Sequence, residues 1–150
     1  MTYQTLKAAV SATLIAGAAV VSGAAAQAAD EQIDLTYVWT AHEGKEQQLI
    51  GTYEMVGQVL DANEPGLLLY EIAVSESGNQ IVIHEVFEDS DALAFHLTET
   101  AAKFFPQLVE FATPGPFIFK GDVPEHLKTA AYSMNMGAIF TDDWSGFERN

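Results

Sequence analysis

Two titratable side chains, His96 and Glu85, are the first candidates for catalysis in this sequence. Because an imidazole titrates close to physiological pH, His96 can hydrogen-bond an oxygen atom of a ligand or act as a general base. Glu85 lies within an apolar run at residues 81–87, where a charged group needs a partner. Both residues also have a structural interpretation, in which His96 ties a helix to the sheet and Glu85 is a candidate for its partner.

Aromatic side chains on the expected strands can form the walls of a pocket for a flat ligand. The candidates for substrate binding are the polar residue His84 and the aromatic residues Tyr37, Trp39, Tyr70 and Phe87. Because His84 and Glu85 are adjacent on a strand, one of them faces the helices and the other faces away. Packing in the hydrophobic core explains the same aromatic residues without a ligand, so both interpretations stay open.

Several kinds of catalytic site are excluded by the sequence. There is no cysteine, which excludes disulfides, thiolate metal sites and cysteine nucleophiles. No two histidines have the spacing of metal ligands on one helix, and Asp142-Asp143 is too short for a calcium loop. Phosphate-binding, nucleophile-elbow and dinucleotide motifs are missing as well. We therefore predict neither a metal nor a cofactor, which fits a cofactor-free enzyme and a non-enzyme equally well.

Length and charge restrict the class of protein. The chain has 150 residues, of which 49% are hydrophobic, enough for the core of about one domain. Its 21 acidic and 6 basic residues give a formal net charge of −15. Nucleic acids and anionic membrane surfaces are bound through Lys and Arg, so we expect neither as a partner.

The first 28 residues have the pattern of a secretory signal peptide. Lys7 precedes an apolar run at residues 8–21, and Ala26-Gln27-Ala28 has the small residues of a cleavage site. Because the run is too short to span a membrane, we predict cleavage after Ala28 and a periplasmic or secreted bacterial protein. An uncleaved anchor helix is the alternative.

The rest of the sequence has the periodicity of an α+β domain. Alternating apolar residues predict strands over 33–40, 67–74 and 81–87, with a fourth strand beginning at 117–119. Apolar stripes predict a helix over 45–62 and another from residue 89 or 90 to 109, with Pro106 as a kink or a new start. The segment Thr113-Pro114-Gly115-Pro116 is expected to end that helix. The order β-α-β-β-α-β predicts a ferredoxin-like fold, an antiparallel sheet with two helices on one face.

The second and third strands are apolar on both faces, although the helices can cover only one. An open antiparallel sheet normally carries polar residues toward water, so the uncovered face needs a partner. A second copy of the same sheet is the simplest partner, and we predict a homodimer through the sheet faces.

Three motifs in order resemble the antibiotic biosynthesis monooxygenase domain family. They are NEPGLLLYE at 63–71, IHEVF at 83–87 and SDALAFHL at 90–97, and the resemblance covers about residues 32–121. The family is a dimeric α+β barrel of the topology derived above. Its members include cofactor-independent monooxygenases that oxidise polycyclic phenols or quinols with O₂, and haem-degrading enzymes.

Departures from the family pattern narrow what the resemblance implies. The haem-degrading branch carries an Asn on the first strand, a Trp on the second helix and a His further along. This chain has Tyr37, His96 and Pro106 at those places, which disfavours haem degradation. Phe87 stands where the quinol-oxidising branch has a Trp, and it keeps an aromatic ring there.

We therefore divide the chain into a signal peptide at 1–28, a ferredoxin-like domain at 29–121 and an extension of that domain at 122–150. The extension is expected to contain a helix from Pro124 to Tyr132 and a strand at 137–140, packed across a dimer or over the pocket mouth. Trp144 and Phe147 are its expected apolar anchors, and a loosely ordered end is the alternative.

Two functions remain possible. One is an exported cofactor-independent monooxygenase acting on a quinol or polycyclic phenol, with His96 as its base. The other is a dimeric small-molecule-binding or stress-response module without turnover. A polar group at the floor of an aromatic pocket favours the enzyme, whereas a pocket filled by aliphatic and Phe side chains favours the module.

Overall fold

The fold is an α+β arrangement built on one five-stranded sheet. The computed structural model describes residues 32–142; the expected signal peptide, Trp144 and Phe147 lie outside them. In chain order the elements are β1 (Ile33–Ala41), α2 (Glu46–Asn63), β2 (Leu67–Val74), β3 (Gln80–Phe87), α3 (Ser90–Phe95), the π-helical segment η1 (His96–Ala101), α4 (Ala102–Leu108), β4 (Ala112–Lys120), α5 (Glu125–Ser133) and β5 (Ala138–Thr141).

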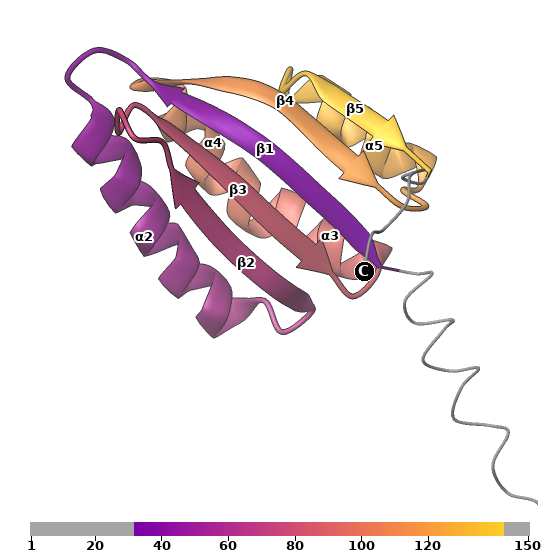
Figure 1. Ribbon diagram of the computed structural model, residues 1–150. Helices are drawn as coiled ribbons and strands as arrows, with labels where there is room; N and C mark the ends of the chain where they lie inside the picture. The colour runs from indigo at the N-terminus through magenta and orange to yellow at the C-terminus, as the bar shows by residue number, and fades with distance from the viewer. Residues whose placement is uncertain (1–31, 143–150) are drawn as a thin grey trace, which may run out of the picture.

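The sheet has the strand order β2-β3-β1-β4-β5, in which only β4 and β5 are parallel neighbours. Helices α3, α4 and α5 lie behind the sheet, while α2 runs along its β2 edge (Figure 1). Along β1, every second side chain from Ile33 to Trp39 is buried in the core, and the residues between them are less buried. The predicted ferredoxin-like fold class is therefore confirmed.

The second helical region begins at a side-chain cap and contains an irregular turn. Asp89 accepts hydrogen bonds from the backbone N–H groups of Asp91 and Ala92, which satisfies donors that the first turn leaves free. Pro106 lies inside α4 rather than at a segment boundary. The irregularity is instead the π-helical segment η1, which comes before the proline, and such wide turns are frequent at functional sites.

Strand β4 begins at Ala112, so the prediction that residues 113–116 only end the helix was wrong. β5 pairs with β4 from Phe117 onward, so Pro114 and Pro116 lie where β4 is still an edge strand. Proline has no backbone N–H group. It is tolerated at this edge because no neighbouring strand is present there to accept a hydrogen bond. The pairing register between β1 and β4 also shifts in this stretch, as it does at a β-bulge.

The C-terminal extension continues the sheet. A helix and a short strand are found where they were predicted, as α5 and β5, and Pro124 precedes the first residue of α5. Phe140 of β5 stacks on Phe119 of β4, with 4.9 Å between the ring centroids. Among residues 32–142, no helix has the length and apolar character needed to cross a membrane.

Candidate functional site

A pocket opens between the helix-facing side of the sheet and the helices that cover it. It is narrow, with a cavity volume of about 40 Å³. Its walls are mainly apolar, and the polar side chains among them are those of Tyr37, Tyr53, His96 and Thr100. The complete lining is Leu35, Tyr37, Trp39, Tyr53, Val56, His96, Leu97, Thr100, Ala101, Phe104, Phe105, Leu108, Phe117 and Met136.

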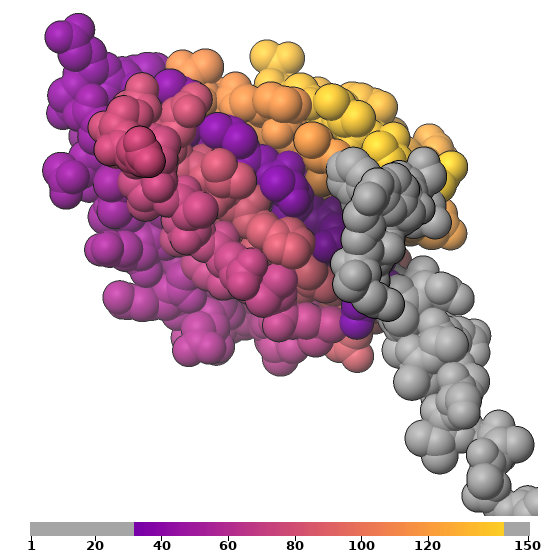
Figure 2. Space-filling model, viewed as in Figure 1, coloured from indigo at the N-terminus to yellow at the C-terminus, as the bar shows by residue number. Residues whose placement is uncertain are grey.

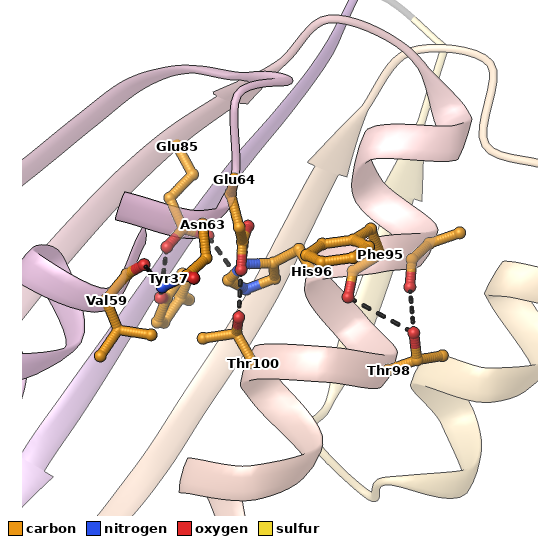
Figure 3. A network of polar contacts seen from close by, with 10 residues as sticks. Tyr37, Val59, Asn63, Glu64, Glu85, Phe95, His96, Thr98 and Thr100 are labelled. Carbon is orange, nitrogen blue, oxygen red and sulfur yellow. Dashed lines mark hydrogen bonds and ion pairs between the residues drawn. The ribbon is translucent and has the colours of Figure 1, made fainter. Parts of the chain in front are cut away.

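A chain of buried polar groups runs behind this pocket (Figure 3). The Tyr37 hydroxyl donates a hydrogen bond of 3.0 Å to Oε1 of Glu85. The other oxygen of Glu85 lies 3.7 Å from Nε2 of His96, and Nδ1 of His96 lies 3.0 Å from Oε2 of Glu64. Thr100 donates to the second oxygen of Glu64. One imidazole therefore lies between two carboxyl groups.

The backbone positions these groups from four separate elements. Tyr37 and Glu85 project from the neighbouring strands β1 and β3 toward the helices. Glu64 is the first residue after α2, and its backbone N–H still donates to Leu60. Gly66 allows the following turn to approach α3, since a Cβ there would lie 2.6 Å from that of Ala92.

Glu64 and Thr100 were not among the site residues proposed from the sequence. Glu64 belongs to the Asn63-Glu64-Pro65-Gly66 segment, whose composition indicates an exposed turn. In the structure only 5% of its surface is exposed, because His96 and Thr100 cover it. Local sequence carries no signal for this burial, which depends on how two distant helices approach.

Burial and mutual charge set the ionisation of the network. Burial raises the pKa of Glu85, Glu64 adds to the rise, and His96 and the Tyr37 hydrogen bond oppose it. Burial by itself would lower the pKa of His96, but the carboxyl groups of Glu85 and Glu64 outweigh it, so the pKa is raised. Burial, followed by the charge of Glu85, raises the pKa of Tyr37 well above its ordinary value. The raised pKa keeps the Tyr37 hydroxyl protonated, which leaves the imidazole of His96 as the group on the pocket wall that can act as a base.

These raised pKa values lead to an expected pH dependence of stability. Glu85 and His96 both have raised pKa values, so the folded protein holds protons that the unfolded chain has lost. The free energy of unfolding should therefore fall as pH rises above 4.5, the ordinary Glu value, and fall further above 6.5. In Glu85→Gln this fall should be shallower, by about 1.4 kcal/mol for every pH unit that separates the folded and unfolded pKa values of Glu85.

Urea unfolding of the wild type and Glu85→Gln between pH 5 and pH 8, about the range where His titrates, measures this effect. Glu54→Gln is the matched control, because Glu54 is exposed on α2. It should keep the slope of the wild type. Equal slopes for all three proteins would show that Glu85 does not hold an extra proton in the folded state.

Two buried polar atoms have no hydrogen-bond partner among the described residues, Nε1 of Trp39 and Oε2 of Glu85. Native proteins rarely leave such groups unpaired, so each calls for an explanation. Trp39 is on the pocket wall, where an indole N–H can donate to an oxygen atom of a ligand. Oε2 of Glu85 is the oxygen nearest His96.

The structure brings some of the sequence-predicted site residues together at the pocket. Tyr37, Trp39 and His96 all line it. Glu85 lies directly behind Tyr37 and His96 and is fully buried. Phe87 packs against the imidazole of His96, with 5.1 Å between ring centroids, so it orients the histidine rather than lining the pocket.

Two other predicted substrate-binding residues lie elsewhere. Tyr70 donates to the carbonyl oxygen of Tyr53 and packs over Gly57, at a surface hollow beside α2. His84 is on the open face of the sheet, 2.9 Å from Asp34 and 3.6 Å from Glu71. The expected division of His84 and Glu85 between opposite faces is thus observed, and His96 is the histidine that faces the pocket.

Metal binding has no support in the described part of the chain. Within residues 32–142, no three His, Asp or Glu side chains gather in a way that could hold a metal ion. The buried carboxyl groups are engaged with His96, Thr100 and Tyr37 instead.

The fold and the pocket define a ferredoxin-like α+β protein with a buried acid–base network at one pocket wall. Residues 35–106 match the family model described as antibiotic biosynthesis monooxygenase. This part of the chain is therefore a domain of the antibiotic biosynthesis monooxygenase family, as the motifs had indicated. None of the curated protein sequences compared with the chain matches it.

Solved structures of similar fold include MupZ from Pseudomonas fluorescens, with a TM-score of 0.60 and 21% identity over 79% of this chain and 95% of that one. SnoaB from Streptomyces nogalater, a cofactor-independent oxygenase, has a TM-score of 0.51 and 16% identity over 59% of this chain and 90% of its own. Protein SO0527 from Shewanella oneidensis has a TM-score of 0.51 and 22% identity over 60% and 87%. At these identities the similarity establishes the fold.

Proposed function

We propose that this protein is an exported, cofactor-independent monooxygenase that oxidises a quinol or polycyclic phenol with O₂. The observation that carries the proposal is His96, an imidazole on the wall of an aromatic pocket with a buried carboxyl group on each side. The family of the domain and the likeness to SnoaB, a cofactor-independent oxygenase, agree with it.

The pocket residues fit the first step of such a reaction. A flat phenol would bind between the aromatic walls with its hydroxyl toward Nε2 of His96, which requires the walls to open beyond the present cavity of about 40 Å³. The indole of Trp39 lies on the same wall beside Tyr53, so a substrate oxygen would compete with the Tyr53 hydroxyl for its N–H.

The substrate itself supplies the electrons for O₂. A phenolate ring carbon that bears hydrogen, opposite the oxygen in a simple phenol and next to it in a quinol, is electron-rich and forms the new C–O bond. Cleavage of the O–O bond then leaves one oxygen atom as a carbonyl and releases the other as water. The two hydrogens of that water come from the phenol O–H and the ring C–H, so atoms and electrons balance without another reductant. The protein binds, orients and moves a proton.

Two polar side chains on the mainly apolar pocket wall, His96 and Thr100, favour this function over the non-catalytic alternative. A binding module has no need of an imidazole held between two buried carboxyl groups, which are costly to bury. His96 and Thr100 are both on the pocket wall. This arrangement supports an enzyme over a small-molecule-binding module on the same fold.

Oxygen consumption by purified residues 29–150 with a panel of hydroquinones and polycyclic phenols tests the function. We expect uptake above the rate of autoxidation, with one atom of ¹⁸O₂ in the organic product and the other in water. No uptake with any member of the panel would favour the binding module.

Export is part of the same proposal and rests on the sequence pattern of residues 1–28. After expression of the full chain in a bacterium, N-terminal sequencing of the periplasmic protein should begin at Ala29. A protein retained in the cytoplasm with Met1 at its N-terminus would contradict export.

We also propose that the open face of the sheet forms a homodimer. Strand register places Val38, Val82 and Ala73 side by side on this face, and Val82 is 40% exposed. Figure 2 looks onto the face, whose surface consists of strand side chains. Ile118 and Ile139 add apolar side chains on β4 and β5, next to a row that continues through Thr36 and His84. A sheet face that exposes apolar side chains among polar ones is typical of an interface.

The dimer proposal predicts a defined effect of a charge on this face. The wild type should sediment as a dimer, and Val82→Asp should sediment as a monomer, because an unpaired carboxylate would be buried in the interface. Val109→Asp is the matched control, since Val109 is 41% exposed at the end of α4. A monomeric wild type, or a dimeric Val82→Asp, would contradict the proposed interface.

A further inference from the structure

Glu64 lies between the pocket and the outer surface of the protein. On one side it contacts His96 and Thr100, both of which line the pocket. On the other side it contributes to two hollows on the surface, one beside α3 and one beside β2. Glu64 therefore separates the pocket-lining residues His96 and Thr100 from the two surface hollows.

The contacts of Glu64 divide its two oxygen atoms between two partners. Oε2 is 3.0 Å from Nδ1 of His96, and Oε1 accepts a hydrogen bond from Thr100. The two partners lie four residues apart in the π-helical segment η1, so this irregular turn presents both of them to one carboxyl group. The side chain is 3% exposed, and the residue borders a hollow on the surface.

We propose that Glu64 is the proton carrier of the site, exchanging protons with Nδ1 of His96 on one side and with solvent on the other. This inference rests on the proposed oxygenase function for its catalytic part. Glu64 does not line the pocket, so it cannot contact the substrate. It is therefore a positioning and relay residue that acts through His96.

The proton balance of the relay is closed over one turnover. Nε2 of His96 accepts the phenol proton while Nδ1 releases its own proton to the Glu64 carboxylate. The ring thereby stays neutral, and Glu64 is protonated. When the O–O bond breaks, the departing oxygen takes a proton from Nε2, and Glu64 returns its proton to Nδ1. While the proton resides on Glu64, it can exchange with water through the surface hollows.

The alternative role for Glu64 is purely structural, as an anchor for η1 at the end of α2. The two roles differ in Glu64→Gln. An amide keeps one acceptor for the His96 N–H and one donor for the Thr100 oxygen, so the anchor is preserved. It cannot accept a proton, so the relay is broken. Glu88→Gln is the matched control, because Glu88 is exposed at one of the same hollows.

The first measurement is the exchange rate of the His96 Nδ1 proton with water, by NMR of ¹⁵N-histidine-labelled protein without substrate. We expect Glu64→Gln to slow this exchange by at least about tenfold and Glu88→Gln to leave it unchanged. An exchange rate in Glu64→Gln equal to that of the wild type would overturn the relay. Because no turnover is needed, this outcome does not depend on the oxygenase function.

The second measurement is steady-state oxygen consumption. The relay predicts that Glu64→Gln lowers kcat by at least about tenfold with KM nearly unchanged, since Glu64 does not contact substrate. Equal kcat values for the wild type and Glu64→Gln would show that Glu64 has only the structural role of anchoring η1. If Glu64→Gln slows the proton exchange but neither the wild type nor any variant consumes oxygen, the proton path is supported and the proposed oxygenase function is refuted.

Glu64→Asp keeps the measurement decisive if the glutamine variant does not fold. Its carboxyl group retains proton exchange but lies one methylene farther from His96. We expect exchange and kcat between those of the wild type and the fully broken relay. The reference for this variant is Glu64→Ala, which has no carboxyl group at this position. If Glu64→Asp folds and its His96 Nδ1 proton exchanges no faster than in Glu64→Ala, proton transfer through the carboxyl group is contradicted.

Discussion

Replacing His96 with alanine is expected to lower kcat for oxygen consumption by about 10²–10⁴-fold, the usual contribution of a general base. His96 is the pocket residue whose pKa is set for proton transfer, and no other imidazole lies on the pocket wall in the described chain. Because Glu85 and Glu64 raise its pKa, the ring is inactive as a base at low pH. The wild-type rate should therefore rise with pH through the His96 pKa, and the alanine variant should lose this rise.

His126→Ala is the control for this prediction, since His126 is exposed on α5. It should retain the rate and the pH profile of the wild type. The same panel of phenols and the same oxygen electrode serve for all three proteins. If His96→Ala consumed oxygen at the wild-type rate, the oxygenase activity would be supported, but His96 would have no part in its mechanism.

Replacing Phe117 with alanine should produce the largest loss of stability among the site residues. Phe117 stacks on Tyr37, with 4.4 Å between centroids, and meets Trp39 edge to face at 6.2 Å. Removing a buried aromatic ring from such a cluster costs about 3–5 kcal/mol. For a domain of this size, the melting temperature should fall by roughly 12–20 °C.

Thermal and urea unfolding of Phe117→Ala and Phe95→Ala measure this effect. Phe95 is the matched control, because its side chain lies at the surface and is 46% exposed. Its replacement should cost less than about 1 kcal/mol. Similar losses in the two variants would show that the aromatic cluster beside the pocket is not a well-packed part of the core.

Much of the fold could be predicted because its strands and helices carry their own periodicity. The alternation in β1 and the break at residues 63–66 indicate element type without knowledge of the whole molecule. The start of β4 could not be predicted, because proline and glycine at 114–116 are typical of a loop. Only the edge position of that part of β4 makes them acceptable in a strand.

The candidate site was predictable in part for a similar reason. His96, Tyr37 and Trp39 are rare polar or aromatic residues in amphipathic elements, and their pattern directs them toward the core. Glu64 has no such pattern, because it lies in a turn and is buried only by contacts with η1. Its role depends on tertiary packing between segments that are distant in sequence.

The central role proposed for the pocket is to bind a phenol whose proton His96 removes. An anaerobic absorption titration tests it directly, with a polycyclic phenol whose pKa lies about one unit above the pH of the assay. We expect the wild type to bind it with the spectrum of the phenolate, and His96→Asn to bind it with the spectrum of the neutral phenol. A neutral phenol bound to the wild type, or no binding at all, would contradict this role.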